Sequence, residues 1–260
     1  NDSINVELIN DNNSSGCMPC VKYKDNISND IYFFNNLFSC SDKDTIIVSG
    51  ENTYDVNFVY SSENNEKLNK TVTIKGNSYI INHSFYFEGF DFNYSDELEL
   101  CWLNGLLPTE KIEAEDIQNA SFVTSFGQDY EKFYYTSSDS VELEIVEGNA
   151  SWIGINNKYF LMSIIPDNRV KSFGHSYASL DFKSRKVTPS YNAFLTFSPS
   201  NNFFLSSKIY LGPLEYDTLK LENVGLENAI SFGWTIIQPF TKGILFVLMF
   251  LKKYINNYGL

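Results

Sequence analysis

Apolar and polar residues alternate with a period of two along the middle of the chain. The alternation is strict in Glu97–Leu100 and Val141–Ile145, so each run predicts a strand with one wet face and one buried face. Tyr159–Ile165 is a continuous apolar run that stops at Pro166, as expected of a strand covered on both faces. Further strand-like runs are Val56–Tyr60, Thr71–Ile74, Tyr79–Phe90, Tyr177–Phe182, Ala193–Phe197 and Phe203–Leu211. Many short strands and little helical periodicity predict a mainly β protein built as an antiparallel sandwich.

The strand pattern divides the chain into three expected parts. Residues 1–25 are polar and predict a loosely ordered tether, and residues 26–211 form the expected β-sandwich body. Residues 212–260 lose the period of two and predict a short helical C-terminal appendage. Within it, Glu215–Leu221 is expected to be a short helix, and Phe240–Asn256, which follows a proline, is the strongest helix candidate.

The composition narrows the possible classes of function. Hydrophobic residues make up 43% of the 260 residues and aromatic residues 16%, which is enough for a sizeable core. The formal net charge of −13 argues against nucleic acid as a partner, since phosphate binding needs a basic surface. The charge is uneven, because Trp234–Leu260 contains three lysines and no acidic residue. An acidic body with a basic, apolar tail is the main asymmetry of the sequence.

No segment is expected to span a membrane. The longest apolar run, Ile244–Leu251, would extend only about 12 Å as a helix, compared with roughly 30 Å of hydrocarbon. The opening residues Asn1–Glu7 are polar and do not form a signal peptide. An exported protein with this sequence is therefore expected to be either a processed form or a piece excised from a longer chain.

The four cysteines leave their chemistry open. Cys17 and Cys20 form a CxxC pair in a polar segment, whereas Cys40 and Cys101 are far away in sequence. A redox CxxC normally lies between a strand and a helix, and a four-thiolate zinc site normally has two close pairs. Neither pattern is evident, so we interpret the cysteines as one or two structural disulfides or as thiols.

Residues suited to acid–base catalysis are few. Only two histidines occur, His83 in a strand-like run and His175 after Gly174 in an expected turn. We interpret both as ordinary surface or satisfied histidines rather than as the acid–base pair of a sugar-epimerising enzyme. Two pairs of carboxylates lie at a spacing of two on one face of an expected strand: Glu97 with Glu99, and Glu142 with Glu144. A solvated strand face explains them, and we expect no catalytic residue, cofactor or metal site.

Segments in the last half of the chain resemble a known family. WIGINNKYFLMSIIP (Trp152–Pro166), KIYLGP (Lys208–Pro213), FGWTIIQPF (Phe232–Phe240) and INNYGL (Ile255–Leu260) follow one another as in the large extracytoplasmic domain of the bacterial membrane protein insertases of the YidC (YidC/Oxa/Alb) family. NKTVTIKGNSYIINHSFYF (Asn69–Phe87) is similar to paired strands of the same domain. The residues that carry the resemblance, to which we assign structural roles, are Trp152, Tyr159, Phe160, Pro166, Tyr210, Gly212, Pro213, Gly233, Pro239, Asn257 and Gly259.

The resemblance implies a twisted super-β-sandwich similar to galactose mutarotases, located in the periplasm between the first and second membrane helices of an inner-membrane protein. The parent protein would insert and fold inner-membrane proteins, alone or with the Sec translocon. The implied partners are Sec components and nascent membrane proteins, and the isolated domain would be a monomeric, non-catalytic scaffold or interaction module. The alternatives are a carbohydrate-binding or mutarotase-like periplasmic protein and a secreted structural or adhesive β protein.

The basic tail is expected to lie on the outer leaflet of the inner membrane as an interfacial helix over Phe240–Tyr254. Its apolar run is too short to span the bilayer and too apolar to remain in water. Lys242, Lys253 and Asn256 project within an arc of roughly 60°, which is the polar side of a helix lying on a surface. The rival arrangement is a helix that packs against protein. The expected membrane-interface residues are Trp234, Phe240, Lys242, Ile244, Phe246, Val247, Phe250, Leu251, Lys252, Lys253, Tyr254 and Tyr258.

Overall fold

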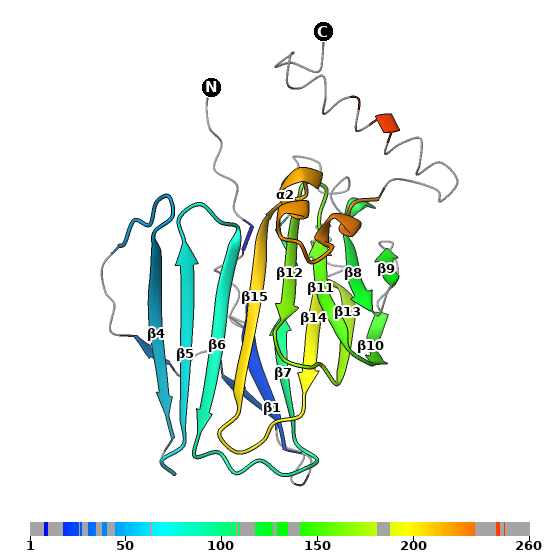
Figure 1. Cartoon of the computed structure of the whole chain (residues 1–260). Coiled ribbons are helices and arrows are strands. Elements are labelled where there is room, and N and C mark those ends of the chain that lie inside the picture. Colours follow the sequence, from blue (N-terminus) through cyan, green and yellow to red (C-terminus); the bar gives the residue numbers. More distant parts are fainter. Residues whose placement is uncertain are drawn as a thin grey trace. The chain divides into compact units, whose positions relative to one another are not determined.

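The computed structural model describes residues 8–9, 18–25, 27, 31–34, 38–40, 45–62, 64–107, 109, 118–126, 129–134, 141–180, 188–231, 243–244 and 247. The chain separates into two compact units, Asn1–Leu214 and Glu215–Leu260. The described strands all belong to the first unit and form two β-sheets, and the described elements of the second unit are short helices (Figure 1).

The two sheets have six and nine strands. The six-stranded sheet has the order β10-β13-β14-β7-β1-β2, and the nine-stranded sheet has the order β3-β4-β5-β6-β15-β12-β11-β8-β9. The strands of the six-stranded sheet are β1 (Cys20–Lys24), β2 (Ile31–Phe34), β7 (Glu97–Trp102), β10 (Val141–Glu147), β13 (Ser172–Leu180) and β14 (Thr188–Phe197). The strands of the nine-stranded sheet are β3 (Ser39–Cys40), β4 (Thr53–Ser61), β5 (Lys67–Lys75), β6 (Ile80–Glu88), β8 (Ser121–Phe126), β9 (Asp129–Tyr134), β11 (Ala150–Asn156), β12 (Phe160–Pro166) and β15 (Phe204–Pro213). All pairings among these strands are antiparallel, which confirms the predicted fold class.

The two sheets enclose an apolar core that is rich in aromatic side chains. Leu98 and Leu100 of β7 are fully buried, whereas the two glutamates of this strand are half-buried, so the predicted alternation is confirmed here. Phe34, Phe87 and Phe90 meet edge to face, with ring centroids 5.4 to 6.4 Å apart. Edge-to-face aromatic contacts stabilise a core beyond the burial of their area.

Strand β12 is covered on both faces, as its continuous apolar run predicted. All residues from Leu161 to Ile165 are buried, and the strand ends at Pro166. It pairs with β11 on one side and β15 on the other, which places it near the centre of the nine-stranded sheet. Proline has no N–H to donate to the ladder, so a position at the end of the strand suits it.

The alternation in β10 does not bury its apolar residues as expected, since Leu143, Glu144 and Ile145 are all exposed. Leu143 and Ile145 are 58% and 54% exposed, whereas Glu144 points to the same side as the buried His175, with 3.6 Å between Oε2 and Nε2. The pairing of β10 with β13 contains an irregularity between Val141 and Glu144. Because a shift of one residue moves every side chain to the opposite face, the alternation alone did not reveal which face of this edge strand lies inside.

Other elements also differ from the expectations. The last residues of the expected tether form β1, whose Val21 is fully buried in the core. Strands β8 and β11 were not predicted, although both lie inside the nine-stranded sheet. Strand β13 begins at Ser172, so His175 lies in a strand rather than in a turn. These segments contain polar and small residues, and pairing with neighbouring strands outweighs their local composition.

The strand registers define two ends of the sandwich. Pro213, the last residue of β15, pairs with Phe160, and Cys20, the first residue of β1, pairs with Cys101. We call the end where β1 begins and β15 finishes the exit end. The opposite end carries the connections between β10 and β11, β12 and β13, and β14 and β15, and we call it the loop end. Since β15 has ten residues, the two ends are about 30 Å apart.

The second unit contains short helices. Its helix α2 (Tyr216–Leu221) confirms the helix predicted over Glu215–Leu221, and a 3₁₀ helix, η1 (Leu226–Ala229), follows it. Gly225 precedes η1 with a φ of 81°, a left-handed conformation that glycine adopts without steric cost. Among the described residues, no helix is long and apolar enough to cross a membrane.

Candidate functional site

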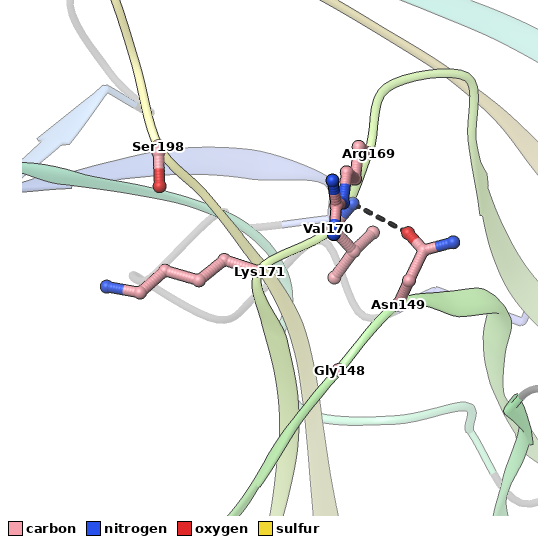
Figure 2. Close-up of a pocket in the computed structure, with 6 residues that line it drawn as sticks. All are labelled: Gly148, Asn149, Arg169, Val170, Lys171 and Ser198. Atoms are coloured by element: carbon pink, nitrogen blue, oxygen red, sulfur yellow. Dashed lines mark hydrogen bonds between the residues drawn. The ribbon is translucent and has the colours of Figure 1, made fainter.

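A cavity of about 490 Å³ opens at the loop end of the sandwich (Figure 2). Three segments that are far apart in sequence line it: the β10–β11 turn, the β12–β13 connection and the residue that follows β14. The lining residues are Gly148, Asn149, Arg169, Val170, Lys171 and Ser198. The volume lies in the range of small-molecule binding sites, so the cavity is a candidate binding site.

Backbone hydrogen bonds hold the walls of the cavity. The N–H of Val170 donates to Oδ1 of Asn149 at 2.9 Å, as Figure 2 shows. The N–H of Gly148 donates to the carbonyl of Lys171 at 3.0 Å, and the N–H of Lys171 donates to the carbonyl of Thr196 at 2.9 Å. These three backbone N–H groups are thus used by the fold, and side chains of the lining residues offer further donors to a ligand.

The cavity carries two cationic side chains with different surroundings. Nζ of Lys171 lies 2.6 Å from Oε1 of Glu97, whose carboxylate is also 4.0 Å from Nζ of Lys24. The exposed guanidinium of Arg169 has no hydrogen-bond or ion-pair partner within the part of the chain that the structure describes. Nothing in the sequence singles out these residues, since cations in polar turns are usual on protein surfaces. The dipeptide Gly148-Asn149, a turn signal, was the only local cue.

His83 lies on β6, inside the sandwich. It is 7% exposed, and its Nδ1 is buried without a hydrogen-bond partner in the structure. Burial, with a smaller contribution from the charge of Lys70, lowers the pKa of His83 to about 3. The expectation of a surface or satisfied histidine is therefore wrong for His83, which is a buried neutral base.

His175 is also buried, at 1% exposure, between aromatic rings. Its ring centroid is 4.3 Å from that of Phe122 and 4.6 Å from that of Phe133. Burial lowers the pKa of His175 to about 4, so the 3.6 Å contact with Glu144 joins a carboxylate to a neutral imidazole. His83 lies on β6, and His175 lies over β8, which is four strands away from β6 in the nine-stranded sheet. Four strand spacings correspond to about 19 Å, so the two histidines do not form one acid–base pair.

Lys70 of β5 projects into a cluster of aromatic rings. Its Nζ lies 5.9 Å from the ring centroid of Phe38 and 5.6 Å from those of Phe58 and Phe85. Burial lowers the pKa of Lys70. Cation–π contacts of this kind stabilise an ammonium group that has lost part of its hydration.

The predicted carboxylate pair of β7 lies on the outer face of the six-stranded sheet. Oε2 of Glu99 is 2.7 Å from Nζ of Lys22, and Glu97 pairs with Lys171 as described above. Glu99 with Lys22 and Glu97 with Lys24 are thus carboxylate–lysine pairs across the β1–β7 ladder, which is a structural arrangement rather than that of a glycosidase. Of the other expected pair, Glu144 contacts His175, and the side chain of Glu142 lies outside the described residues.

The described cysteines include both a disulfide-bonded residue and residues outside any disulfide, the two states that the sequence left open. Cys20 is disulfide-bonded, whereas Cys40 and Cys101 are not part of a disulfide. Cys101 is opposite Cys20 in the ladder, and burial raises the pKa of its thiol far above the ordinary value. Among the described residues, no group of three or more histidine, cysteine or acidic side chains is placed to hold a metal ion.

A sequence model of the YidC periplasmic domain matches residues 1–247 of the chain. The chain belongs to the family of YidC periplasmic domains. It is 28% identical over 240 residues to the membrane protein insertase YidC of Chlorobaculum parvum, which covers 89% of the chain and 39% of that relative. It is 26% identical over 225 residues to the membrane protein insertase YidC of Chloroherpeton thalassium. This match covers 84% of the chain and 38% of that relative. The chain thus spans about two-fifths of the length of the curated relatives that it matches.

Solved structures with similar backbones are parts of larger enzymes. The GH36 alpha-galactosidase AgaA variant A355E of Geobacillus stearothermophilus has a TM-score of 0.43 at 8% identity, covering 76% of the YidC-family chain and 30% of the enzyme. Heparan sulfate lyase HepC of Pedobacter heparinus has a TM-score of 0.40 at 11% identity, and the match covers 69% of the chain and 22% of the lyase. Similarity at this level says nothing about the activity of a YidC periplasmic domain.

The YidC-family motif residues in the described regions occupy structural positions. Trp152 and Tyr210 are fully buried, and Oη of Tyr210 donates to the carbonyl of Pro213 at 2.7 Å. A Cβ atom at Gly212 would lie 2.6 Å from Cγ of Tyr79, so only glycine fits beside this ring without a shift. Phe160 and Pro166 begin and end β12, while Tyr159 just precedes it and is 47% exposed. The remaining motif residues, Gly233, Pro239, Asn257 and Gly259, lie outside the described residues.

The expected membrane-interface residues of this YidC-family chain are described at two positions. Ile244 and Val247 are helical and are 62% and 54% exposed. Three residues apart, they project toward similar sides of a helix. The other residues expected at the interface lie outside the described residues.

Proposed function

We propose that this chain is the periplasmic domain of an inner-membrane insertase and that it acts there as a non-catalytic scaffold. The match of the YidC periplasmic domain model to residues 1–247 carries the proposal. The fold supports it in one respect: β1 begins and β15 finishes at the same end of the sandwich, as suits a domain held between two membrane helices.

The parent protein, in this proposal, assists the insertion and folding of inner-membrane proteins, alone or with the Sec translocon. The partners of the domain are Sec components and nascent membrane proteins. An acidic body, with a net charge of −13 on the chain, suits contacts with proteins better than contacts with an anionic lipid surface.

The proposal includes a membrane contact for the C-terminal segment. Ile244 and Val247, both exposed, belong to the apolar run that is expected to lie at the lipid surface. Co-sedimentation with liposomes that contain anionic lipid should decrease when residues 240–260 are deleted, and high salt should remove only part of the binding. Equal binding of both forms, or none by either, would favour packing of this helix against protein.

The periplasmic location is tested with the complete parent protein in cells. The domain should sediment with inner membranes and resist added protease in intact cells. It should become cleavable once the outer membrane is opened, while a cytoplasmic marker stays protected. Cleavage only after lysis of the inner membrane would place the domain in the cytoplasm and overturn the proposal.

A mutarotase-like function is the second candidate, and the contact between His175 and Glu144 at 3.6 Å is the observation that favours it. The burial of His175 between two phenylalanine rings leaves no access for a sugar. We therefore expect aldose mutarotation, followed by polarimetry, to proceed at the uncatalysed rate. A faster rate that disappears in His175→Ala or His83→Ala would support the enzyme instead.

A further inference from the structure

We propose that the cavity at the loop end is a binding site for a carboxylate, with Arg169 as its principal ligand-binding residue. The site is a cavity of about 490 Å³ on an acidic chain, and its two charged lining residues are both cations. The inference goes beyond the scaffold role, and the chemistry of the site does not depend on that role.

The first reason is the state of Arg169. Its guanidinium lines the cavity and has no ion-pair or hydrogen-bond partner among the described residues. A guanidinium presents donors in a planar fork that matches the two oxygens of a carboxylate. The hydroxyl of Ser198 and the amide nitrogen of Asn149 add neutral donors at the same cavity.

The second reason concerns the charge of the ligand. Lys171 is already paired with Glu97 at 2.6 Å, so one carboxylate of the protein lies next to the site. Arg169 is then the lining cation that has no partner among the described residues, and one guanidinium balances a single negative charge. The backbone N–H groups of Gly148, Val170 and Lys171 donate within the fold, so these three donors are not available to a phosphate. A singly charged carboxylate is therefore favoured over phosphate.

The third reason is the position of the cavity. It lies at the loop end, about 30 Å from the exit end along β15. If the exit end faces the membrane, as suits the proposed function, the cavity faces away from the lipid. The carboxylate then comes from a peptide C-terminus or a free organic acid of the aqueous space rather than from a lipid headgroup.

The experiment is a titration of the ¹⁵N-labelled chain with N-acetyl-Ala-Ala, followed through the backbone amide signals of residues 148, 149, 170 and 171. The matched probe is the C-terminal amide of the same dipeptide, which lacks only the charge. Acetate and phenyl phosphate are the other two probes.

We expect saturable shifts with N-acetyl-Ala-Ala, none with its amide, and weaker binding of phenyl phosphate. Tighter binding of acetate than of the dipeptide would identify the ligand as a free organic acid, and the reverse would identify a peptide C-terminus.

The variants assign the effect to Arg169. Arg169→Gln should weaken dipeptide binding by about tenfold or more, and Arg169→Lys by less, because lysine keeps the charge but not the fork. The control is Lys208→Gln, which removes a nearby exposed lysine that pairs with Asp167 at 3.9 Å and does not line the cavity. Equal binding of dipeptide and amide, the same loss in Arg169→Gln and Lys208→Gln, preferential binding of phenyl phosphate, or no saturable shift with any probe would overturn the proposal. Because Arg169 is exposed, its variants are expected to keep the dispersed spectrum of the folded chain.

Discussion

The buried body of the sandwich and its loop end differ in the exposure of their polar side chains. In the body, burial lowers the pKa values of His83 and His175, and the hydroxyl of Tyr210 is tied to the backbone. At the loop end, Arg169 and Lys171 are exposed around a cavity. Changes in the body should therefore affect stability, whereas changes at the loop end should affect binding and leave stability almost unchanged.

The largest expected effect is the loss of a buried aromatic side chain. Tyr210→Ala should lower the free energy of unfolding by about 3–5 kcal/mol, because it leaves a cavity where a fully buried ring now packs. Urea denaturation measures this. The matched control is Tyr94→Ala, at a fully exposed tyrosine, with an expected change below about 0.5 kcal/mol. Similar losses in the two variants would show that burial at Tyr210 does not stabilise the fold.

Acid should destabilise the body through its histidines. Their pKa values are lowered in the folded chain, from 6.5 to about 3 for His83 and about 4 for His175. Below pH 6.5 the unfolded chain therefore binds protons that the folded chain does not, and the free energy of unfolding falls. Between pH 7 and pH 5 the loss is about 2 kcal/mol for each histidine.

The acid prediction is checked with histidine variants. His83→Gln and His175→Gln should each reduce the difference between the unfolding free energies measured at pH 7 and pH 5. Carboxylates contribute to the same pH dependence in all forms, so the comparison between variant and parent isolates the histidines. If both variants keep the full difference, the buried histidines are not neutral as described.

A smaller effect is expected from the hydroxyl of Tyr210 alone. Tyr210→Phe leaves the ring in place but removes the donor to the carbonyl of Pro213. The free energy of unfolding should fall by about 1 kcal/mol, as for a typical buried hydrogen bond. Thermal or urea unfolding measures it, and a loss as large as that of Tyr210→Ala would mean that the hydrogen bond, not the packing, dominates at this position.

The smallest expected effect lies at the loop end. Arg169→Gln should change the free energy of unfolding by less than about 0.5 kcal/mol, since the side chain is exposed and has no partner in the described part of the chain. The same urea measurement applies. A decrease in the free energy of unfolding of more than about 1 kcal/mol would show that Arg169 stabilises the fold. The distinction between a body that sets stability and a loop end that sets binding would then be wrong.

The parts of the fold that were predictable are those in which local pattern and burial agree. Leu98 and Leu100 alternate with glutamates and are buried, and β12 is apolar throughout and is covered on both faces. The pattern in β10 is equally regular, but an irregular register turns Leu143 and Ile145 outward. Periodicity therefore identifies a strand, while the choice of its inner face depends on partners that the local sequence does not specify.

The candidate site was not predictable for a related reason. Arg169 and Asn149 stand 20 positions apart in sequence and line the same cavity only because β11 and β12 bring their flanking turns to the loop end. Each residue alone is typical of a solvated turn. The family motif residues had a stronger signal, but those in the described regions serve packing, as Tyr210 and Gly212 show. Their recognition identified the family and not the site.

Membrane insertion by the complete parent protein is the most direct test of the claim that this chain is part of an insertase. The parent gene should be expressed in cells depleted of their own insertase, with a single-spanning membrane protein as the reporter. Insertion is measured as the fraction of reporter that yields a membrane-protected fragment after protease treatment. We expect this fraction to return to the level of undepleted cells. A parent protein that is expressed and located in the membrane, yet leaves the reporter fully uninserted, would contradict the account.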